Sequence, residues 1–251
     1  MKIRTSIPYF LTSLSQVALL LIISIMLTMT LTSCKGKQVE EKKALKLLKT
    51  INHEEGIYTE FEYDDKNRIV KVSTIYPEDE ETSYSAVFNY IGDDLLEGFE
   101  RNGNTITVIG TPTTITIDKA GYMIKKVDAP TDTSGGSEEI FEYQDGNLIK
   151  YTAKYTFGTA VVTSKHDDKH SIYNCNTPKW IFLYFPYDLP FANGGSKNNE
   201  IETSSISALD GSFGQSVYNY TYDDDGYPTH IEWGNDYGDF WSVSFEYFEV
   251  E

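Results

Sequence analysis

The chain repeats one pattern, in which an aromatic or β-branched run is followed by a short polar turn and a returning apolar run. The stretch FEYDDKNRIVKV, residues 61–72, is the first example. Similar stretches begin at Phe88, Ile115, Phe141 and Tyr220. Because recurrence at a regular period indicates a repeated supersecondary unit, this feature constrains the fold more than any other.

The period can be measured from the last residue before each polar turn. These residues are Tyr63, Tyr90, Ile117, Tyr143, His166, Tyr222 and Tyr247. Their spacings are 27, 27, 26, 23, 56 and 25 residues. The long spacing is about two ordinary ones, which predicts one diverged or replaced unit between His166 and Tyr222.

The polar turns contain Asp, Asn and Gly, as in DDKN, DKAG, QDGN and DDDG. Asp side chains accept hydrogen bonds from their own turn backbone, and Gly or Asn tolerates a positive φ. Each unit is therefore predicted to be a β-hairpin. Calcium binding by the Asp pairs is the alternative, but none of them has the acidic and glycine spacing of a calcium loop.

We expect an all-β fold, a sequential antiparallel hairpin meander of a dozen or more strands, because tight turns alternate with longer loops. Open twisted sheets rarely stay flat beyond about ten strands, so the sheet should be strongly curled or partly closed. The tight turns should gather at one end of it. They lie near Asp65, Asp94, Lys119, Asp145, Asp168 and Asp224.

Alternation in the last strand predicts one apolar and one solvated face, since Trp241, Val243, Phe245 and Tyr247 are separated by polar residues. A membrane-spanning barrel has the same alternation. Its lipid-facing band tolerates charges badly, however, so the charged residues of the repeats disfavour that alternative.

The first 33 residues have the features of a secretory signal peptide, because Lys2 and Arg4 precede an apolar run from Val17 to Leu31. The run ends in Leu-Thr-Ser-Cys at residues 31–34, which resembles the bacterial lipoprotein signal at all four positions. An ordinary signal peptide or an anchor helix is the alternative.

The lipoprotein resemblance implies that Cys34 becomes the lipidated first residue of the mature chain. More than one acyl chain on Cys34 would anchor the protein stably without crossing the membrane. We therefore expect a bacterial cell-envelope protein with a lipid anchor, in the outer membrane. The sequence leaves open whether it faces the periplasm or the cell surface.

The charge of the chain limits the molecules that it can bind, and its cysteine content limits the disulfide bonds that it can form. The chain has 21 basic and 38 acidic residues, and removal of residues 1–33 leaves 19 basic ones, a net charge of about −19. This charge argues against nucleic acid as a partner. Lipidation of Cys34 leaves Cys175 without a disulfide partner, and we expect Cys175 to be buried or inert.

Residues 34–56 are predicted to form a tether with a short amphipathic helix, because Ala44, Leu48 and Ile51 have helical spacing. The helix would pack on the end of the sheet or serve as a spacer. A membrane-surface helix is the alternative, since five lysines lie between Lys37 and Lys49. The single β domain would then span residues 57–251.

The repeat is interrupted at about residues 174–213, where PKWIFLYFPYDLPF concentrates large aromatic residues. We expect this segment to lie as a plug against the concave apolar face of the sheet. The alternative is an aromatic platform for sugar rings or an apolar ligand. Its candidate residues are Trp180, Tyr184, Tyr187, Trp233 and Trp241.

Patterns typical of catalysis are sparse. The residues His166, Asp167, Asp168 and His170 could bind zinc, but they occupy the turn position of the other units, so an ordinary turn is favoured. No serine has a nucleophile-elbow pattern and no glycine-rich loop has phosphate-binding form. No cofactor, metal or catalytic residue is therefore predicted.

The lipoprotein signal and the hairpins FEYDDKNRI and YTYDDDGYP together resemble the YD-repeat-like lipoproteins abundant in Bacteroidetes. Many of these proteins are grouped in a family of unknown function with a porin-like, strongly curled antiparallel fold. The resemblance covers most of residues 57–251 and implies that fold, but it implies no catalytic residues.

Two classes of function remain. The first is a non-enzymatic, lipid-anchored binding or structural module whose ligand is a glycan or an envelope protein. The second is an envelope glycan hydrolase with a carboxylate pair, since some of the 38 acidic residues will lie at a suitable separation. A cleft with two close carboxylates would favour the hydrolase, and buried plug aromatics would favour the binding module.

Overall fold

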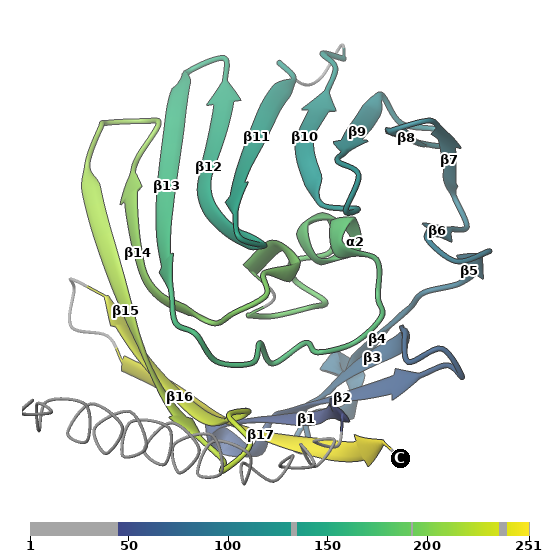
Figure 1. Ribbon diagram of the computed structural model, residues 1–251. Helices are drawn as coiled ribbons and strands as arrows, with labels where there is room; N and C mark the ends of the chain where they lie inside the picture. The colour runs from purple at the N-terminus through teal and green to yellow at the C-terminus, as the bar shows by residue number, and fades with distance from the viewer. Residues whose placement is uncertain (1–44, 132–134, 192, 236–239, 251) are drawn as a thin grey trace, which may run out of the picture. The chain divides into compact units, whose positions relative to one another are not determined.

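The computed structural model describes residues 45–131, 135–191, 193–235 and 240–250. They belong to one compact unit, Ala44–Glu251, in which fifteen strands form a single antiparallel sheet (Figure 1). A separate two-stranded ladder joins β5 to β6. The all-β antiparallel meander predicted from the sequence is confirmed.

The strands follow the hairpin repeat along the chain. Their bounds are β1 Leu45–His53, β2 Tyr58–Tyr63, β3 Ile69–Ile75, β4 Tyr84–Val87, β5 Tyr90–Ile91, β6 Leu95–Leu96, β7 Phe99–Asn102, β8 Thr105–Val108, β9 Thr113–Ile117, β10 Met123–Asp128, β11 Ser137–Gln144, β12 Asn147–Tyr155, β13 Gly158–His166, β14 Glu200–Ile206, β15 Phe213–Tyr222, β16 Pro228–Asn235 and β17 Phe240–Val250. The helical segments are η1 Glu54–Gly56, η2 Glu80–Thr82, α2 Lys179–Tyr184 and η3 Asn193–Gly195.

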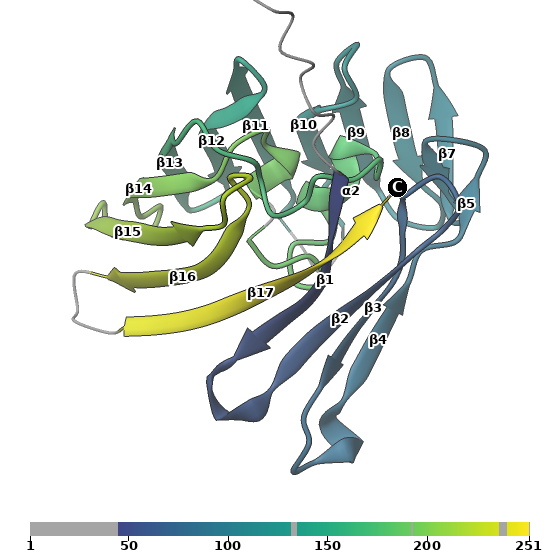
Figure 2. The ribbon, with the colours of Figure 1, turned by 60° about the horizontal axis from the view of Figure 1, so that its bottom comes forward.

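The sheet order is sequential except at one junction, where the first strand pairs with the last. The order is β4-β3-β2-β1-β17-β16, continuing through consecutive strands to β7. The free edges of the sheet are therefore β4 and β7, and it is not closed. Figures 1 and 2 show the strands curling around a central segment that contains α2.

Residues 45–53 form a strand, so the amphipathic helix predicted within the tether is wrong. A β-bulge explains the misleading pattern. Leu48 pairs with Tyr247 and Ile51 with Phe245, and the register shifts between Leu48 and Thr50. Because the bulge inserts one residue, Leu48 and Ile51 face the same side although they are three residues apart. The sheet therefore begins before Gly56, within the predicted tether.

The tight turns have the predicted Asp chemistry. At Asp64, Asp118 and Asp223, the carboxylate accepts hydrogen bonds from the backbone N–H groups two and four residues later, at 2.9–3.0 Å. The residue three positions after each of these aspartates has a positive φ, and it is Asn67, Gly121 and Gly226 in turn. The carboxylates of the three aspartates thus accept hydrogen bonds from turn amides and are not free to bind calcium.

The interruption of the repeat is shorter than predicted and begins earlier. It covers residues 167–199, because β14 pairs with β13 and returns the chain to the sheet at Glu200. We call residues 167–199 the plug. Subtracting these 33 residues from the long spacing of 56 leaves 23, an ordinary repeat. The plug is thus an insertion between two neighbouring strands, and no hairpin unit has been replaced.

The plug lies against the concave face, as predicted. Trp180, Ile181 and Phe182 of α2 are fully buried with the inward side chains of the sheet. Phe99 of β7 makes an edge contact with Trp180, with ring centroids 5.0 Å apart. In the described part of the chain no helix has the length and apolar character needed to cross a membrane.

Hydrogen bonds from the plug reach the tight turns of several hairpins. Backbone N–H groups of the plug donate to the carbonyls of Asn67, Gly146 and Gly226, at 2.9, 2.9 and 3.2 Å. The Trp180 indole donates to the carbonyl of Asp94 at 3.0 Å. These turns therefore gather at one end of the sheet around the plug, in agreement with the predicted arrangement.

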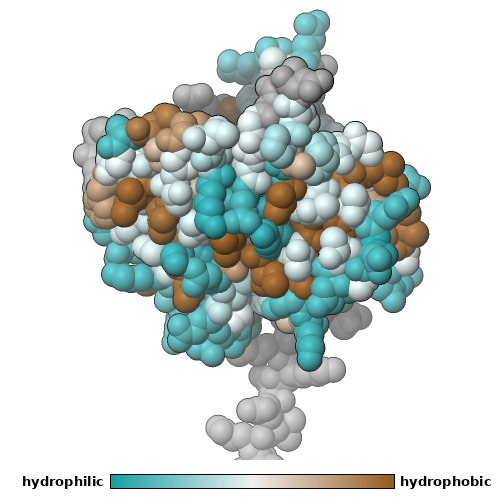
Figure 3. Space-filling view, turned by 90° about the horizontal axis from the view of Figure 1, so that it is seen from above, coloured by the Kyte–Doolittle hydropathy of each residue, from teal (hydrophilic) through white to brown (hydrophobic). Residues whose placement is uncertain are grey.

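The outer face of the sheet is solvated and rich in ion pairs. Lys71 pairs with Glu62 at 2.7 Å, and Lys150 pairs with Glu142 at 2.6 Å. Figure 3 shows the surface seen from above in the orientation of Figure 1, where hydrophilic residues lie between apolar patches. The inward face is thus apolar, and the outer face is solvated and carries these ion pairs, as the alternation predicted.

Candidate functional site: a cavity between plug and sheet

The aromatic residues predicted as a ligand platform do not form one surface. Trp180 is only 1% exposed, so it cannot stack on a ligand, and this part of the prediction is wrong. Tyr184 is half-buried and packs on Phe99 with ring centroids 5.2 Å apart. Tyr187, in contrast, is 90% exposed.

The two predicted tryptophans of the sheet do lie together. Trp233 and Trp241 face each other across β16 and β17, with ring centroids 5.9 Å apart and planes inclined by 22°. Phe191 of the plug makes an edge contact with Trp233 at 5.2 Å. This pair therefore supports the far end of the plug and is separate from the buried Trp180.

A cavity of about 400 Å³ lies between the plug and strands β11–β14. Its walls are mostly apolar. The sheet contributes Phe141, Leu148, Tyr151 and Val162, and the plug contributes Phe182, Leu183, Leu189 and Phe191. Sites for small molecules typically have volumes of about 300–1,000 Å³ and mainly apolar walls with a few polar groups, and this cavity fits that description.

The cavity has a buried carboxyl group in one wall. Glu200, the first residue of β14, is 8% exposed, and burial raises its pKa to about 7. A hydrogen bond with Ser164 partly opposes this rise. Near neutral pH, Glu200 can therefore donate a hydrogen bond as a carboxylic acid or accept one as a carboxylate.

A second polar group of the cavity is already satisfied within the protein. The Tyr151 hydroxyl donates to Glu139 at 3.1 Å, and the Lys126 ammonium lies 3.0 Å from the same carboxylate. Burial raises the pKa of Tyr151, and the charge of Glu139 adds to this effect, so the hydroxyl stays protonated. The Tyr151 hydroxyl is therefore already bonded to Glu139 in this part of the cavity wall.

The two carboxyl groups of the cavity are far apart. Through the strand register, Glu139 is aligned with Ala160 of β13, whereas Glu200 pairs with His166 of the same strand. Six residues along a strand correspond to about 20 Å. Glycoside hydrolases hold their two carboxyl groups about 5–9.5 Å apart, so this pair does not have the required geometry.

Sequence reasoning missed Glu200 because a register shift determines its side. The pairing of β13 with β14 shifts between Lys165 and His166. Glu202, two residues after Glu200, forms an ion pair with Lys165 on the exposed side. Simple alternation would place Glu200 and Glu202 on the same face of the sheet. The β-bulge instead places them on opposite faces.

The predicted zinc alternative finds no support. In the ranges that the structure describes, no group of three or more His, Cys, Asp or Glu side chains is placed to hold a metal. The Asp167 carboxylate accepts hydrogen bonds from Asn199 and from the Tyr222 hydroxyl. His170 instead stacks on Tyr227, with ring centroids 4.6 Å apart. The segment is the start of the plug and does not form the predicted hairpin turn.

Cys175 lies in the plug, and its thiol donates to Thr177 at 3.4 Å. Burial raises the pKa of this thiol, which disfavours the reactive thiolate. Cys34 lies outside the described residues, as do the signal peptide and most of the predicted tether.

The fold and the cavity together define an open, curled antiparallel sheet with an internal plug. Comparison with known proteins adds distant similarities to solved structures, among them two porin-like proteins. The crystal structure of a porin-like protein from Bacteroides vulgatus matches with a TM-score of 0.40 and 13% identity, over 82% of this chain and 100% of that chain. That of a porin-like protein from Bacteroides uniformis matches with a TM-score of 0.41 and 12% identity, over 79% and 96%. No family model and no curated protein matches the chain.

Proposed function

We propose that this chain is a lipid-anchored, non-enzymatic protein of the bacterial cell envelope that binds a small, mainly apolar ligand between its plug and its sheet. The observation that carries the proposal is the cavity of about 400 Å³ with mostly apolar walls. Its buried Glu200 gives such a ligand one polar partner. Few precisely placed polar groups in an apolar cavity are typical of small-molecule sites.

The composition of the cavity favours an apolar ligand over a glycan. Sugar rings need exposed aromatic faces, but Trp180 is buried, and the stacked Trp233 and Trp241, of which Trp241 is 42% exposed, do not line this cavity. The separation of Glu139 and Glu200 supports binding over hydrolysis, because no carboxylate pair of suitable spacing lines this cavity.

The proposal can be tested by filling the cavity. Val162 lines it, so Val162→Trp should occupy the space and abolish the fluorescence enhancement of the neutral probe N-phenyl-1-naphthylamine. Val161, the preceding residue of β13, is the matched control. It pairs with Thr152 and points to the outer face, so Val161→Trp should bind the probe like the unaltered protein.

Circular dichroism and thermal unfolding of both variants would verify the fold. Equal probe binding by the two variants would contradict the proposed site. If the protein does not bind the probe but binds glycans on an array, this result would instead favour the glycan-binding alternative.

The lipid anchor needs its own test. Cys34→Ala, expressed with the complete signal, should move the protein from the detergent phase to the aqueous phase in a cloud-point partition. The mature chain should also lose the mass of the acyl groups. The lipobox at residues 31–34 and the resemblance to YD-repeat-like lipoproteins support the anchor and the outer-membrane location. Unchanged partition and mass would contradict the anchor.

A further inference from the structure

Most basic side chains of this acidic protein form ion pairs. The described residues include fifteen Lys and Arg side chains, and twelve of them lie within 4 Å of a carboxylate oxygen. Within those same residues, Lys119, Lys179 and Lys197 have no such partner. These three residues therefore mark places where an external anion could replace an internal one.

Two of the three lysines line one cavity at the tight-turn end of the sheet. This cavity has a volume of about 640 Å³ and is distinct from the apolar one. Lys119 lies in the turn between β9 and β10, and Lys179 is the first residue of α2. Other polar residues line the remaining wall, among them Asn104 and Asn176.

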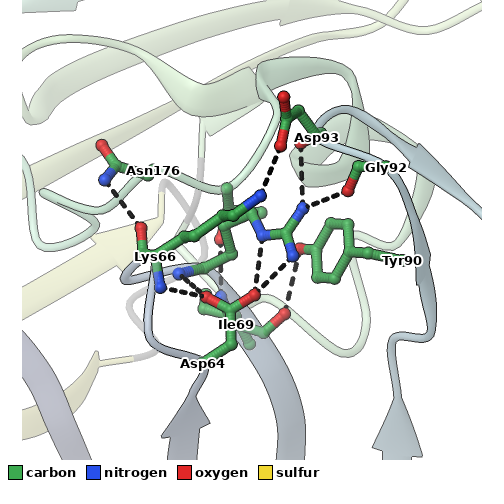
Figure 4. Close-up of polar contacts among 9 residues, drawn as sticks. Asp64, Lys66, Ile69, Tyr90, Gly92, Asp93 and Asn176 are labelled. Atoms are coloured by element: carbon green, nitrogen blue, oxygen red, sulfur yellow. Dashed lines mark hydrogen bonds and ion pairs between the residues drawn. The ribbon is translucent and has the colours of Figure 1, made fainter.

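The acidic residues of this cavity are already engaged. Asp93 accepts an ion pair from Lys66 at 2.6 Å, as Figure 4 shows, and Asp94 is paired with Arg101. Asp118 accepts hydrogen bonds from two backbone N–H groups of its own turn, both at 2.9 Å. The positive charges of Lys119 and Lys179 are therefore opposed in this cavity only by the turn-bound carboxylate of Asp118.

Lys179 is the more unusual of the two lysines. Its ammonium lies 5.6 Å from the centre of the Phe182 ring, and burial lowers its pKa. The nearby Cys175 thiol has a raised pKa and stays neutral, so it supplies no countercharge. A half-buried cation without an anionic partner is energetically unfavourable, and a bound oxyanion would relieve this cost.

We propose that this second cavity binds a small, polar, phosphorylated molecule, with Lys179 and Lys119 contacting its phosphate group. Lysine is a common partner of phosphate oxygens. The volume of about 640 Å³ exceeds the needs of a bare phosphate, so the polar wall around Asn104 and Asn176 would contact the rest of the molecule. This inference does not depend on the apolar cavity.

Isothermal titration calorimetry on the mature protein provides the test, with inorganic phosphate, glucose 6-phosphate, glucose and glucuronate as probes. Glucose 6-phosphate should bind more tightly than phosphate, and glucose should not bind. Comparable binding of glucuronate would identify a general oxyanion site and overturn the assignment to phosphate.

Substitutions should identify the contacting lysines. Lys179→Met keeps the aliphatic stem and should weaken glucose 6-phosphate binding about tenfold or more, since a charge-assisted hydrogen bond is lost. Lys119→Met should weaken it less because Lys119 is exposed. Lys165→Met removes the same charge from an exposed ion pair on the outer face and should change nothing. Equal affinity in all three variants would overturn the proposal.

A second measurement uses the unaltered protein, so its result does not depend on whether the variants fold. Reductive methylation followed by mass spectrometry should label Lys119 and Lys179 less in the presence of glucose 6-phosphate. Labelling of Lys165 should not change. Absence of protection at both lysines would contradict the site even if every variant folded poorly.

Discussion

The sheet and the plug differ in how their buried residues are arranged along the sequence. In the sheet, one aliphatic side chain follows each tight turn, and Ile69, Leu96 and Met123 occupy this place at intervals of 27 residues. In the plug, by contrast, the three consecutive residues Trp180, Ile181 and Phe182 are all buried.

This difference has a consequence for stability. Each strand of the sheet contacts mainly its two neighbours, whereas the plug makes hydrogen bonds to the turns of several hairpins. A change in one hairpin is therefore expected to remain local. A change in the plug should loosen several hairpins together, and the following predictions test this contrast from the largest effect to the smallest.

The largest effect is expected for Phe182→Ala. The ring is fully buried and packs on Tyr173 within the plug, with ring centroids 5.2 Å apart. Removing a buried aromatic side chain costs about 3–5 kcal/mol, which urea unfolding would measure as a lower free energy of unfolding. Tyr187→Ala, a few residues away at an exposed position, should leave stability nearly unchanged. Similar values for both variants would contradict the central role of the plug.

The second effect depends on pH and concerns Glu200. Its folded-state pKa of about 7 lies above the ordinary value of 4.5, so the folded protein holds a proton that the unfolded chain releases. Stability should therefore fall as pH rises from about 4.5 to about 7, by up to about 3 kcal/mol, and then level off.

Glu200→Gln is the matched variant, because it keeps the size and removes the ionisation. Its free energy of unfolding should lack this component of the pH dependence and exceed that of the unaltered protein at pH 8. If the two proteins have parallel stability curves between pH 5 and 8, Glu200 does not carry the raised pKa.

The smallest effects should come from single hydrogen bonds between plug and sheet. The Ser196 hydroxyl accepts from the backbone N–H of Leu148 at 3.0 Å, and Thr177 accepts from that of Ile69 at 2.8 Å. Ser196→Ala or Thr177→Val leaves a buried N–H unsatisfied, at a cost of about 1–3 kcal/mol.

The control for these two variants is Ser73→Ala, because Ser73 bonds to another hydroxyl in an exposed place. Its stability should stay close to that of the unaltered protein. Amide hydrogen exchange would show whether Leu148 and Ile69 lose protection in the plug variants, and unchanged protection would contradict the assigned bonds.

The hairpins were predictable because their information is local. In three of the tight turns an aspartate bonds to amides within four residues, and alternation over a few residues defines the inward face. The strand β1 was mistaken for a helix because a bulge after Leu48 imitates helical spacing. A bulge requires knowledge of the partner strand, which the sequence alone does not provide.

The cavities were not predictable for a related reason. The apolar cavity lies between residues of the plug and strands of the sheet, and Glu200 enters it through a register shift. The aromatic run indicated correctly that the segment would be buried, but not which ring would be fully enclosed. Lys179 gave no signal in the sequence, because its lack of a partner depends on where every carboxylate lies.

The pairing of β1 with β17 affects the order in which the protein can be completed during synthesis. β1 leaves the ribosome long before β17, yet β17, the last strand that the structure describes, is its partner on one side. Until β17 emerges, one edge of β1 has no neighbour, and the apolar side chains of Leu48 and Ile51 lack the aromatic residues that face them. A ribosome that stops before β17 would therefore release a chain with a further exposed edge available for aggregation, so synthesis through β17 is a condition for covering this edge of β1.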